Sequence, residues 1–344
     1  AFVSDLQRVI SGTSAHWRFV HVYLNGLYWG ITGLHERPDD KFAEEYFGGD
    51  SAEYDVLRHN ANNVVAGNNA AYNQIFSMAR GGLSNNVAYE ALQQMLDLPW
   101  FIDYMIINFW AGNTDWAHQN WYACRRRAAD GKWRYLSWDA EHVLKSPSQN
   151  SLSLTNSGGP TELFQLLRAN PECRVRFGDH VHRHFFNGGV FSVDSTQPVP
   201  LDNPVANRPA ALYLKRIWEI DPAMVGESAR WGDSGDYGVD RSNNPLTRNG
   251  DWIPELLALM GWTNSPAHSA SFNLFPTRSG IVLGQFVSAG LYPSVAAPSF
   301  SQHGGAVPVG YELRITAPAG KVYYTTNGVD PRVYGSGSVS PAAV

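Results

Sequence analysis

The stretch from Pro99 to Asn120, PWFIDYMIINFWAGNTDWAHQN, decides the fold of this chain. Between residues 100 and 110 apolar side chains occur on every side of a helix, and a helix that is apolar all round is a buried one. Pro99 suits the start of this helix, because the backbone N–H groups of a first turn have no partner within the helix. We therefore expect a core helix over 100–110 that holds the polar loop around Asp115 rigidly.

Two polar side chains follow this loop at informative intervals. Four residues separate Asp115 from Asn120, and Asp139 follows a strand-like run over 132–138. The catalytic loop of protein kinases has the same interval between its base Asp and a metal-binding Asn. Phosphoryl transfer needs a carboxylate to orient the acceptor hydroxyl and oxygen ligands to hold Mg²⁺ on the phosphates. The spacing alone is weak evidence, since about one Asp-x4-Asn pair is expected by chance in such a chain.

The remaining sequence alternates between helical and strand patterns. Asn25-Gly26 between two apolar runs is a strong hairpin signal, so we expect a β-hairpin over 17–34. Strands are also expected at 54–57, 120–125 and 133–138. Helices are expected at 2–10, 40–46, 70–80, 86–96, 160–187 and 209–231. The pattern predicts an α+β fold.

The character of the sequence changes after about residue 270. The Pro-containing run over 271–298 is expected to be a connector docked on the main domain. Residues 299–344 then alternate apolar and polar side chains, with strand patterns at 311–316 and 321–326. These patterns predict a small all-β module at the end of the chain.

The composition excludes several classes of protein. The chain has 344 residues, 44% of them hydrophobic, which is enough for a packed core in roughly two domains. Charged residues make up 17% and the net charge is −5, so no global basic field for nucleic acid is expected. No apolar run is long enough for a membrane span. Cys124 and Cys173, the only cysteines, leave one disulfide bridge or two buried thiols open.

Other polar residues have plain structural interpretations beside functional ones. Asn113 and Asp115 are also typical turn formers. His180 and His184 share one face of a predicted helix, but no His-Glu-x-x-His pattern accompanies them, so a structural role is favoured over a metal site. His118 lies in the Asp115 loop, where an exposed histidine is the simpler interpretation.

Several runs together resemble the CotH kinase family, the spore-coat-type atypical protein kinases. The runs are Val22–Gly30 (VYLNGLYWG), Glu36–Asp39 (ERPD), Phe101–Tyr104 (FIDY), Gly112–Trp116 (GNTDW), Asn120-Trp121, and Gly131–Trp133 leading to Trp138-Asp139. Their order and spacing agree with the family over roughly residues 1–270. Separately, residues 322–332 (VYYTTNGVDPR) resemble the chitobiase/β-hexosaminidase C-terminal-type β module, which extracellular bacterial proteins often carry.

The resemblance implies an atypical protein-kinase-like fold with an incomplete N-lobe. Residues 1–270 would be the kinase-like domain, with an N-lobe remnant at 1–38 and a mainly helical C-lobe at 39–270. A connector at 271–298 and a partial chitobiase-like β module at 299–344 would follow. The chain begins after the segment expected to hold the phosphate-covering loop and the nucleotide-binding basic residue. An inactive piece of a longer phosphotransferase is therefore an open alternative.

The resemblance also assigns roles to individual residues. ATP and Mg²⁺ are the implied cofactors, with Asp115 as the catalytic Asp and Asn120 and Asp139 as metal ligands. Glu36 and Arg37 would belong to the hinge beside the adenine. Glu141 stands where many relatives carry a second Asp, and its carboxylate can also ligate Mg²⁺.

The implied function is transfer of the ATP γ-phosphoryl group to a Ser, Thr or Tyr hydroxyl of a protein substrate. A non-catalytic binding or adhesion protein is the alternative, in which the β module holds cell-surface polysaccharide. A glycoside hydrolase is a third option, because Asp115 and Asp139 are two carboxylates that could flank a sugar. The β module resemblance implies a secreted or cell-surface bacterial protein.

Overall fold

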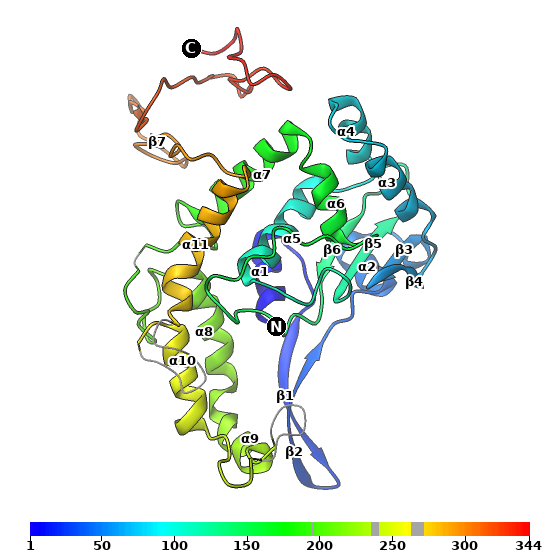
Figure 1. Cartoon of the computed structure of the whole chain (residues 1–344), viewed down its shortest axis with the longest axis vertical. Helices are drawn as coiled ribbons and strands as arrows, with labels where there is room; N and C mark the ends of the chain where they lie inside the picture. The colour runs from blue at the N-terminus through cyan, green and yellow to red at the C-terminus, as the bar shows by residue number, and fades with distance from the viewer. Residues whose placement is uncertain (195, 235–240, 263–271) are drawn as a thin grey trace.

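The computed structural model describes residues 1–194, 196–234, 241–262 and 272–344 and shows a mixed α+β fold (Figure 1). Its helices are α1 (Phe2–Ser11), α2 (Asp40–Phe47), α3 (Ala70–Arg80), α4 (Asn86–Gln93), α5 (Leu98–Ala111), α6 (Pro160–Leu167), α7 (Pro171–Phe185), α8 (Arg208–Ile220), α9 (Met224–Trp231), α10 (Ile253–Leu259) and α11 (Leu274–Ser288). Its strands are β1 (Trp17–Leu24), β2 (Leu27–His35), β3 (Tyr54–Arg58), β4 (Asn60–Ala66), β5 (Trp121–Arg126), β6 (Arg134–Ser137), β7 (Ser299–Phe300) and β8 (Ile315–Thr316). No helix in the described ranges is both long and apolar enough to cross a membrane.

Helix α5 lies at the centre of the core, as its all-round apolar sequence predicts. Every residue of α5 except Pro99 is buried, and α1, α7, α11 and β6 pack around it. The side chain of Asp97 accepts a hydrogen bond from the backbone N–H of Trp100 and so caps the start of the helix. Gly112 ends it in the left-handed conformation that glycine adopts at little cost. The polar loop that follows therefore starts from a rigid base.

A four-stranded antiparallel sheet with the order β4-β3-β5-β6 lies beside α5. In the β5–β6 pair Trp121 is opposite Ser137, so the residue before β5 and the residues after β6 lie at the same end of the sheet. This register brings Asn120 and Asp139 to one place. Strand β4 is absent from the sequence prediction, because its first residues, NANN, show no apolar alternation.

Both faces of this sheet are covered. Trp121 and Ala123 of β5 face the main core, while Tyr122 and Cys124 face a smaller cluster under α2. This is the two-residue alternation of a strand that is buried on both sides.

Cys124 and Cys173 are free and buried, and burial raises the pKa of each thiol to about 12. Of the two alternatives that the sequence left open, the structure has two buried thiols.

The β1–β2 hairpin projects away from the body of the protein (Figure 1). Its far part is attached to α9 through Glu227, which accepts hydrogen bonds from the Tyr28 hydroxyl (2.7 Å) and the Ile31 backbone N–H (2.6 Å). The predicted hairpin, including its Asn25-Gly26 turn, is confirmed. Its partner on the helical side, α9, is nearly 200 residues away in sequence and could not be predicted.

The run over 271–298, expected to be a docked connector, contains a helix that the sequence did not predict. From residue 274 this run forms α11, which packs on α5, α7 and α10. Pro276 lies in the first turn, where it is tolerated, and Leu274, Val282 and Phe286 are buried. Residue 271 lies outside the described residues. The domain boundaries themselves remain a prediction.

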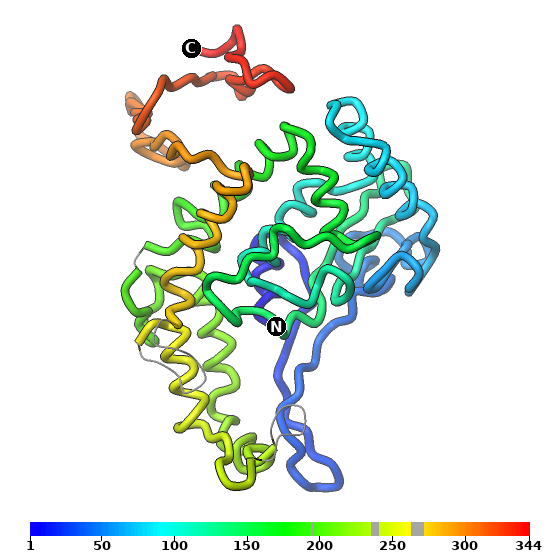
Figure 2. Tube along the Cα trace, in the orientation of Figure 1, coloured from blue at the N-terminus to red at the C-terminus, as the bar shows by residue number. Residues whose placement is uncertain are grey.

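The predicted strands of the C-terminal module are wrong over most of their length. Only Ile315–Thr316 of the 311–316 run pairs, with Ser299–Phe300, and residues 321–326 form no strand. Figure 2 shows this segment running away from the helical body beyond α11. A two-stranded ladder is marginal without a second layer, and Tyr323 is 45% exposed. The expected β module is therefore not formed as a packed unit by these residues.

Candidate functional site

The loop after α5 is shaped by local amide hydrogen bonds. Asn113 is buried and donates from its side chain to Oδ1 of Asn108 at 3.0 Å. Its own Oδ1 accepts the backbone N–H of Asp115 at 3.1 Å. Asn113 is therefore a turn former, as the structural interpretation of the sequence holds. Its turn fixes the position from which the Asp115 carboxylate extends.

The Asp115 carboxylate is the centre of a polar cluster. The Asn120 amide nitrogen donates to Oδ2 at 3.0 Å, and Gln119 donates to both carboxylate oxygens at 2.8 and 2.9 Å. Nε2 of His118 lies 3.3 Å from Oδ1. The Asp115 side chain is 21% exposed, so the cluster orients it while leaving it accessible. Because the nitrogen of the Asn120 amide is used, its oxygen is the atom that could ligate a cation.

His59 binds the backbone of Asn120 and lies within electrostatic range of Asp139. Its Nδ1 accepts the backbone N–H of Asn120 at 2.8 Å, so this nitrogen carries no proton. Burial, followed by the charge of Arg58, lowers the pKa of His59, while the charge of Asp139 opposes the shift. A neutral imidazole therefore braces the backbone at Asn120, close to the second predicted ligand. No motif surrounds His59 in the sequence, so its role could not be predicted.

Left-handed backbone conformations gather around this cluster. Six described residues other than glycine have a positive φ, and four of them are His59, Asn120, Asp139 and Leu144. Asn, Asp and His adopt this conformation more readily than most residues, whereas a leucine at φ 58° is an outlier. Such strain persists where the surrounding structure enforces it, and it concentrates at functional sites. The left-handed residues therefore lie at the same place as the Asp115–Asn120–Asp139 pattern.

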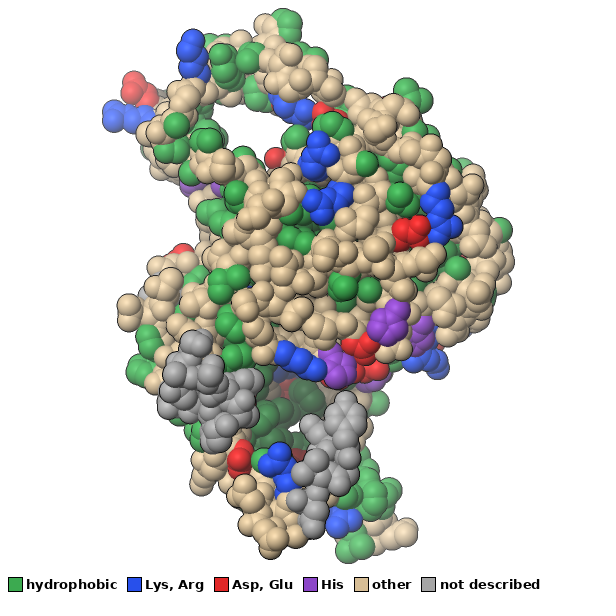
Figure 3. All heavy atoms as spheres, viewed as in Figure 1, with side chains coloured by type: hydrophobic (Ala, Val, Ile, Leu, Met, Phe, Trp, Pro, Cys, Tyr) green, Lys and Arg blue, Asp and Glu red, His purple; other side chains and the backbone are tan. Residues whose placement is uncertain are grey.

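Glu141 is closer to Asp115 than its place in the sequence indicates. Ligand atoms of Asp115, Glu141 and His142 all lie within 4.8 Å of one another. Asp139 does not join that group of described residues, but it lines a small pocket of about 220 Å³ together with Glu141. Figure 3 shows His and acidic side chains gathered on this face, between the body and the hairpin. Of the predicted ligands, Asn120 and Glu141 therefore lie close to Asp115, whereas Asp139 lies next to this group in the pocket with Glu141.

The donor set fits a magnesium site. The predicted ligands offer carboxylate and amide oxygens, which are the ligands that Mg²⁺ prefers. His142 adds a nitrogen, and its Nε2 lies 3.4 Å from the carboxylate of Glu141. The Glu141 side chain is 54% exposed and can turn toward a cation without rearranging the core.

Arg278 holds the two loops of the site together from behind. It is 1% exposed and donates 2.7 Å hydrogen bonds to four backbone carbonyls, those of Phe109, Trp110, Pro147 and Gln149. The first two belong to the end of α5 and the others to the loop after Asp139. Burial lowers the pKa of this guanidinium to about 10. A lone arginine in the apolar run 274–286 was the available signal in the sequence.

Backbone contacts also join these loops. Thr114 donates its backbone N–H to the carbonyl of His142 at 3.1 Å, and Leu144 donates to the carbonyl of Ala111 at 2.9 Å. These two hydrogen bonds join the Asp115 loop to the loop after Asp139.

Glu36 and Arg37 lie near the sheet but not in the Asp115 cluster. Glu36 accepts from the His16 backbone N–H at 2.9 Å and from the Tyr46 hydroxyl at 2.7 Å. Burial raises the pKa of Glu36, but these hydrogen bonds outweigh it and lower the pKa overall. Arg37 donates to the Tyr122 hydroxyl at 3.1 Å. Both side chains thus have structural partners in this structure.

Arg58 was missed by the sequence analysis and lies closer to the cluster. Its guanidinium is 5.7 Å from the ring centroids of both Tyr122 and Trp138. Its Nε is buried and has no hydrogen-bond partner among the described residues. Arg58 precedes His59 and Trp138 precedes Asp139 in the chain, so this cation stands at the edge of the site.

Residues 1–185 match the family of CotH kinase proteins. The match covers more than half of the chain and includes every residue of the site described above except Arg278. The chain belongs to this family. No curated protein matches it.

Proposed function

We propose that this protein is an atypical protein kinase that transfers the γ-phosphoryl group of ATP to a protein hydroxyl with Mg²⁺. The family supports a kinase-like protein in general terms. The observation that supports the specific reaction most is the Asp115–Asn120 hydrogen bond of 3.0 Å, with Asn120 and Asp139 both in left-handed backbone conformations. These residues have the types and the spacing that phosphoryl transfer uses.

In the proposed mechanism Asp115 accepts and orients the proton of the acceptor hydroxyl. Gln119 and Asn120 hold its carboxylate, so the hydroxyl meets a base that is already in position. The oxygens of Asn120, Asp139 and Glu141 would hold Mg²⁺. Mg²⁺, when bound, would supply positive charge that neutralises the negative charge developing during transfer.

Two of the proposed nucleotide contacts, Arg37 and Arg58, lie beside Tyr122 of β5. Glu36 and Arg37 are the proposed hinge residues beside the adenine. Arg58 is a better candidate for a phosphate contact, because its Nε is unpartnered and it adjoins His59 and Trp138. A guanidinium is suited to phosphate oxygens, which it can bind through two parallel hydrogen bonds.

A direct test is transfer of label from γ-labelled ATP to a panel of acceptor proteins. Label should appear on protein only with Mg²⁺ and should be lost in Asp115→Asn. Asp130→Asn, the same exchange at an exposed turn residue, should transfer label at the wild-type rate. Equal labelling by wild type and Asp115→Asn would contradict the proposed role of Asp115.

A non-catalytic binding protein is the second candidate function, with a secreted or cell-surface location. It is favoured by the aromatic side chains of the C-terminal segment, since Tyr323, Tyr324 and Tyr334 are 45%, 41% and 47% exposed. Exposed tyrosines can stack on sugar rings, so polysaccharide is the proposed ligand. Cosedimentation with insoluble polysaccharides, with and without residues 299–344, separates this function from catalysis. Retention that survives the deletion would contradict a binding role for this segment.

A further inference from the structure

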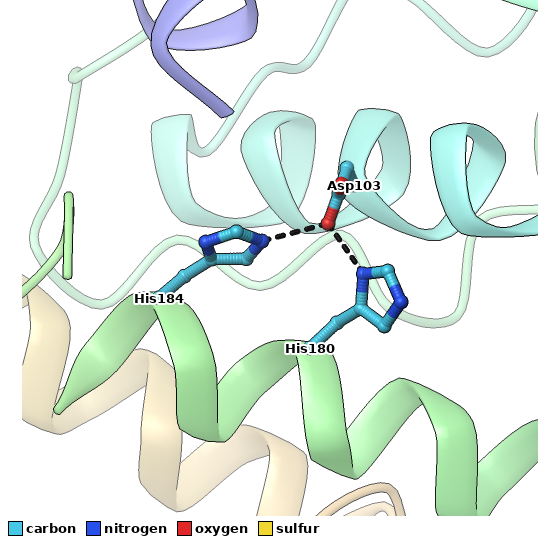
Figure 4. Close-up of side chains that lie close together, drawn as sticks. All are labelled: Asp103, His180 and His184. Carbon is cyan, nitrogen blue, oxygen red and sulfur yellow. Dashed lines mark hydrogen bonds and ion pairs between the residues drawn. The ribbon is translucent and has the colours of Figure 1, made fainter. Parts of the chain in front are cut away.

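Three side chains connect α5 and α7 at a point separate from the kinase site (Figure 4). Asp103 lies on α5, and His180 and His184 lie one turn apart on α7, all pointing toward one another. Nδ1 of His180 is 2.6 Å and Nε2 of His184 is 2.7 Å from Oδ1 of Asp103. The two imidazoles therefore converge on a single carboxylate oxygen.

This cluster is buried, and two imidazoles face the Asp103 carboxylate. Asp103, His180 and His184 are only 6%, 5% and 6% exposed. Within the described part of the chain, Asp103 has no Lys or Arg in ion-pair distance. Burial raises the pKa of Asp103, but the hydrogen bonds and charges of the two imidazoles outweigh it and lower the pKa. A buried carboxylate that stays ionised needs a compensating cation.

We propose that Asp103, His180 and His184 form a binding site for a divalent transition-metal ion of the Zn²⁺ class. Two imidazole nitrogens and one carboxylate oxygen are a donor set that Zn²⁺ accepts, with a fourth position left for water. Mg²⁺ favours oxygen ligands, so the donor chemistry separates this site from the one around Asp115. The ion would take over from the imidazole N–H groups as the positive partner of the buried carboxylate.

Metal binding requires only a small change at the cluster. The two ring nitrogens that now donate to Asp103 must lose that proton, which moves to the other ring nitrogen of a neutral imidazole or to solvent from an imidazolium. Around a tetrahedral Zn²⁺ with bonds of about 2.0–2.1 Å, neighbouring ligand atoms lie roughly 3.3 Å apart. The ligand atoms already lie within 4.8 Å of one another. Opening the hydrogen bonds by roughly 0.7 Å makes room for the ion.

The site is structural in this proposal and does not depend on the proposed kinase activity. Ala111, the end of α5, is eight residues beyond Asp103, which is about 12 Å along the helix. An ion at Asp103 fastens α5 to α7 and so stiffens the base of the Asp115 loop without touching its substrates. Failure of the kinase proposal would leave the metal site untouched.

The test is Zn²⁺ stoichiometry and affinity of the whole chain after chelator treatment and dialysis, measured by elemental analysis and titration. The wild type and Asp139→Asn should each bind one Zn²⁺ per chain, because the kinase site is not involved. His180→Gln and His184→Gln should bind it about tenfold or more weakly. His182→Gln is the matched control, since His182 lies on the same helix but contacts Tyr292.

Co²⁺ provides a second readout that does not depend on the folding of a variant. Wild-type protein loaded with Co²⁺ should show the intense visible absorption of a four-coordinate site, and stoichiometric Zn²⁺ should remove it. Absence of tight Zn²⁺ binding in the wild type would overturn the proposal and leave a hydrogen-bonded Asp-His-His cluster. Binding lost in Asp139→Asn but kept in His180→Gln would overturn it as well.

Discussion

Asn120 donates a 3.0 Å hydrogen bond from its amide nitrogen to the carboxylate of Asp115. The backbone N–H of the same Asn120 is bound by His59, so its side chain and its main chain are both fixed. The proposed base and the proposed metal ligand are therefore held relative to each other before any substrate binds. Preorganisation of this kind is what a phosphoryl-transfer site requires.

Replacing Asp115 should lower the rate of phosphoryl transfer without lowering the stability of the fold. Asp115→Asn keeps an acceptor for Gln119 but removes the charge and the basicity. We expect phosphoryl transfer to fall by about 10²–10⁴-fold, the usual contribution of a general base. Affinity for ATP and the melting temperature should change little. Steady-state transfer rates and a thermal melt check this, and an unchanged transfer rate would remove Asp115 from the mechanism.

Replacing Arg278 should cost stability and function together. Arg278→Met removes a donor from four backbone carbonyls, of which those of Phe109 and Gln149 keep a longer hydrogen bond from Gly112 and Gln285. Each buried group left unsatisfied costs about 1–3 kcal/mol. We expect a loss of about 3 kcal/mol or more in the free energy of unfolding, measured by denaturant titration. Arg168→Met is the graded control, since Arg168 donates 2.7 Å to the single carbonyl of Ala289, and it should lose roughly 1 kcal/mol. Equal losses of stability in the two variants would contradict the proposed role of Arg278 in holding the end of α5 against the loop after Asp139.

The C-terminal segment should detach from the body in acid. Glu172 on α7 accepts from both terminal nitrogens of Arg332 (2.6 and 2.7 Å) and from the backbone N–H of Gly335 (2.7 Å). The Arg332 hydrogen bonds, with the Gly335 N–H, lower the pKa of Glu172 against the opposing effect of burial. Because the folded pKa lies below the ordinary 4.5, this stabilisation is present above pH 4.5 and is lost as pH falls through the folded pKa.

Hydrogen exchange of residues 299–344 measures this attachment. Exchange of the Gly335 amide, which donates to Glu172, should be slow at neutral pH, faster as the pH falls below 4.5 after correction for intrinsic rates, and already fast at neutral pH in Glu172→Gln. Glu312→Gln is the control, because it makes the same exchange at an exposed residue of the same segment. Protection in Glu172→Gln equal to that of the wild type would show that other contacts hold the segment.

The sequence predicted the elements whose signals are local. An apolar pattern on every side of a helix placed α5 in the core, and Asn25-Gly26 placed the hairpin turn. The prediction of the C-terminal strands was wrong over most of their length, because an alternating pattern forms a stable strand only where a pairing strand and a second layer exist. Helix α11 was missed, since its prolines suggested a connector although Pro276 lies in the tolerated first turn.

The parts of the site that could not be predicted depend on packing between distant segments. Arg278 reaches the loops only because α11 lies against α5, and His59 meets Asn120 across the β3–β5 pairing. His180 and His184 were expected to share a helix face, but their carboxylate partner Asp103 is about 80 residues away. Contacts between residues so far apart depend on the tertiary fold. They produce no recognisable interval in the sequence from which they could be predicted.

Calorimetric titration with ATP, with and without Mg²⁺, tests the central claim most directly. The wild type should bind ATP with Mg²⁺ and bind it at least tenfold more weakly without the ion. Asp139→Asn keeps a residue that tolerates φ 48° but removes the charge, so its binding should no longer depend on Mg²⁺. Asp130→Asn should behave as the wild type. Mg²⁺-dependent ATP binding of equal affinity in Asp139→Asn, or no binding in the wild type, would contradict the account.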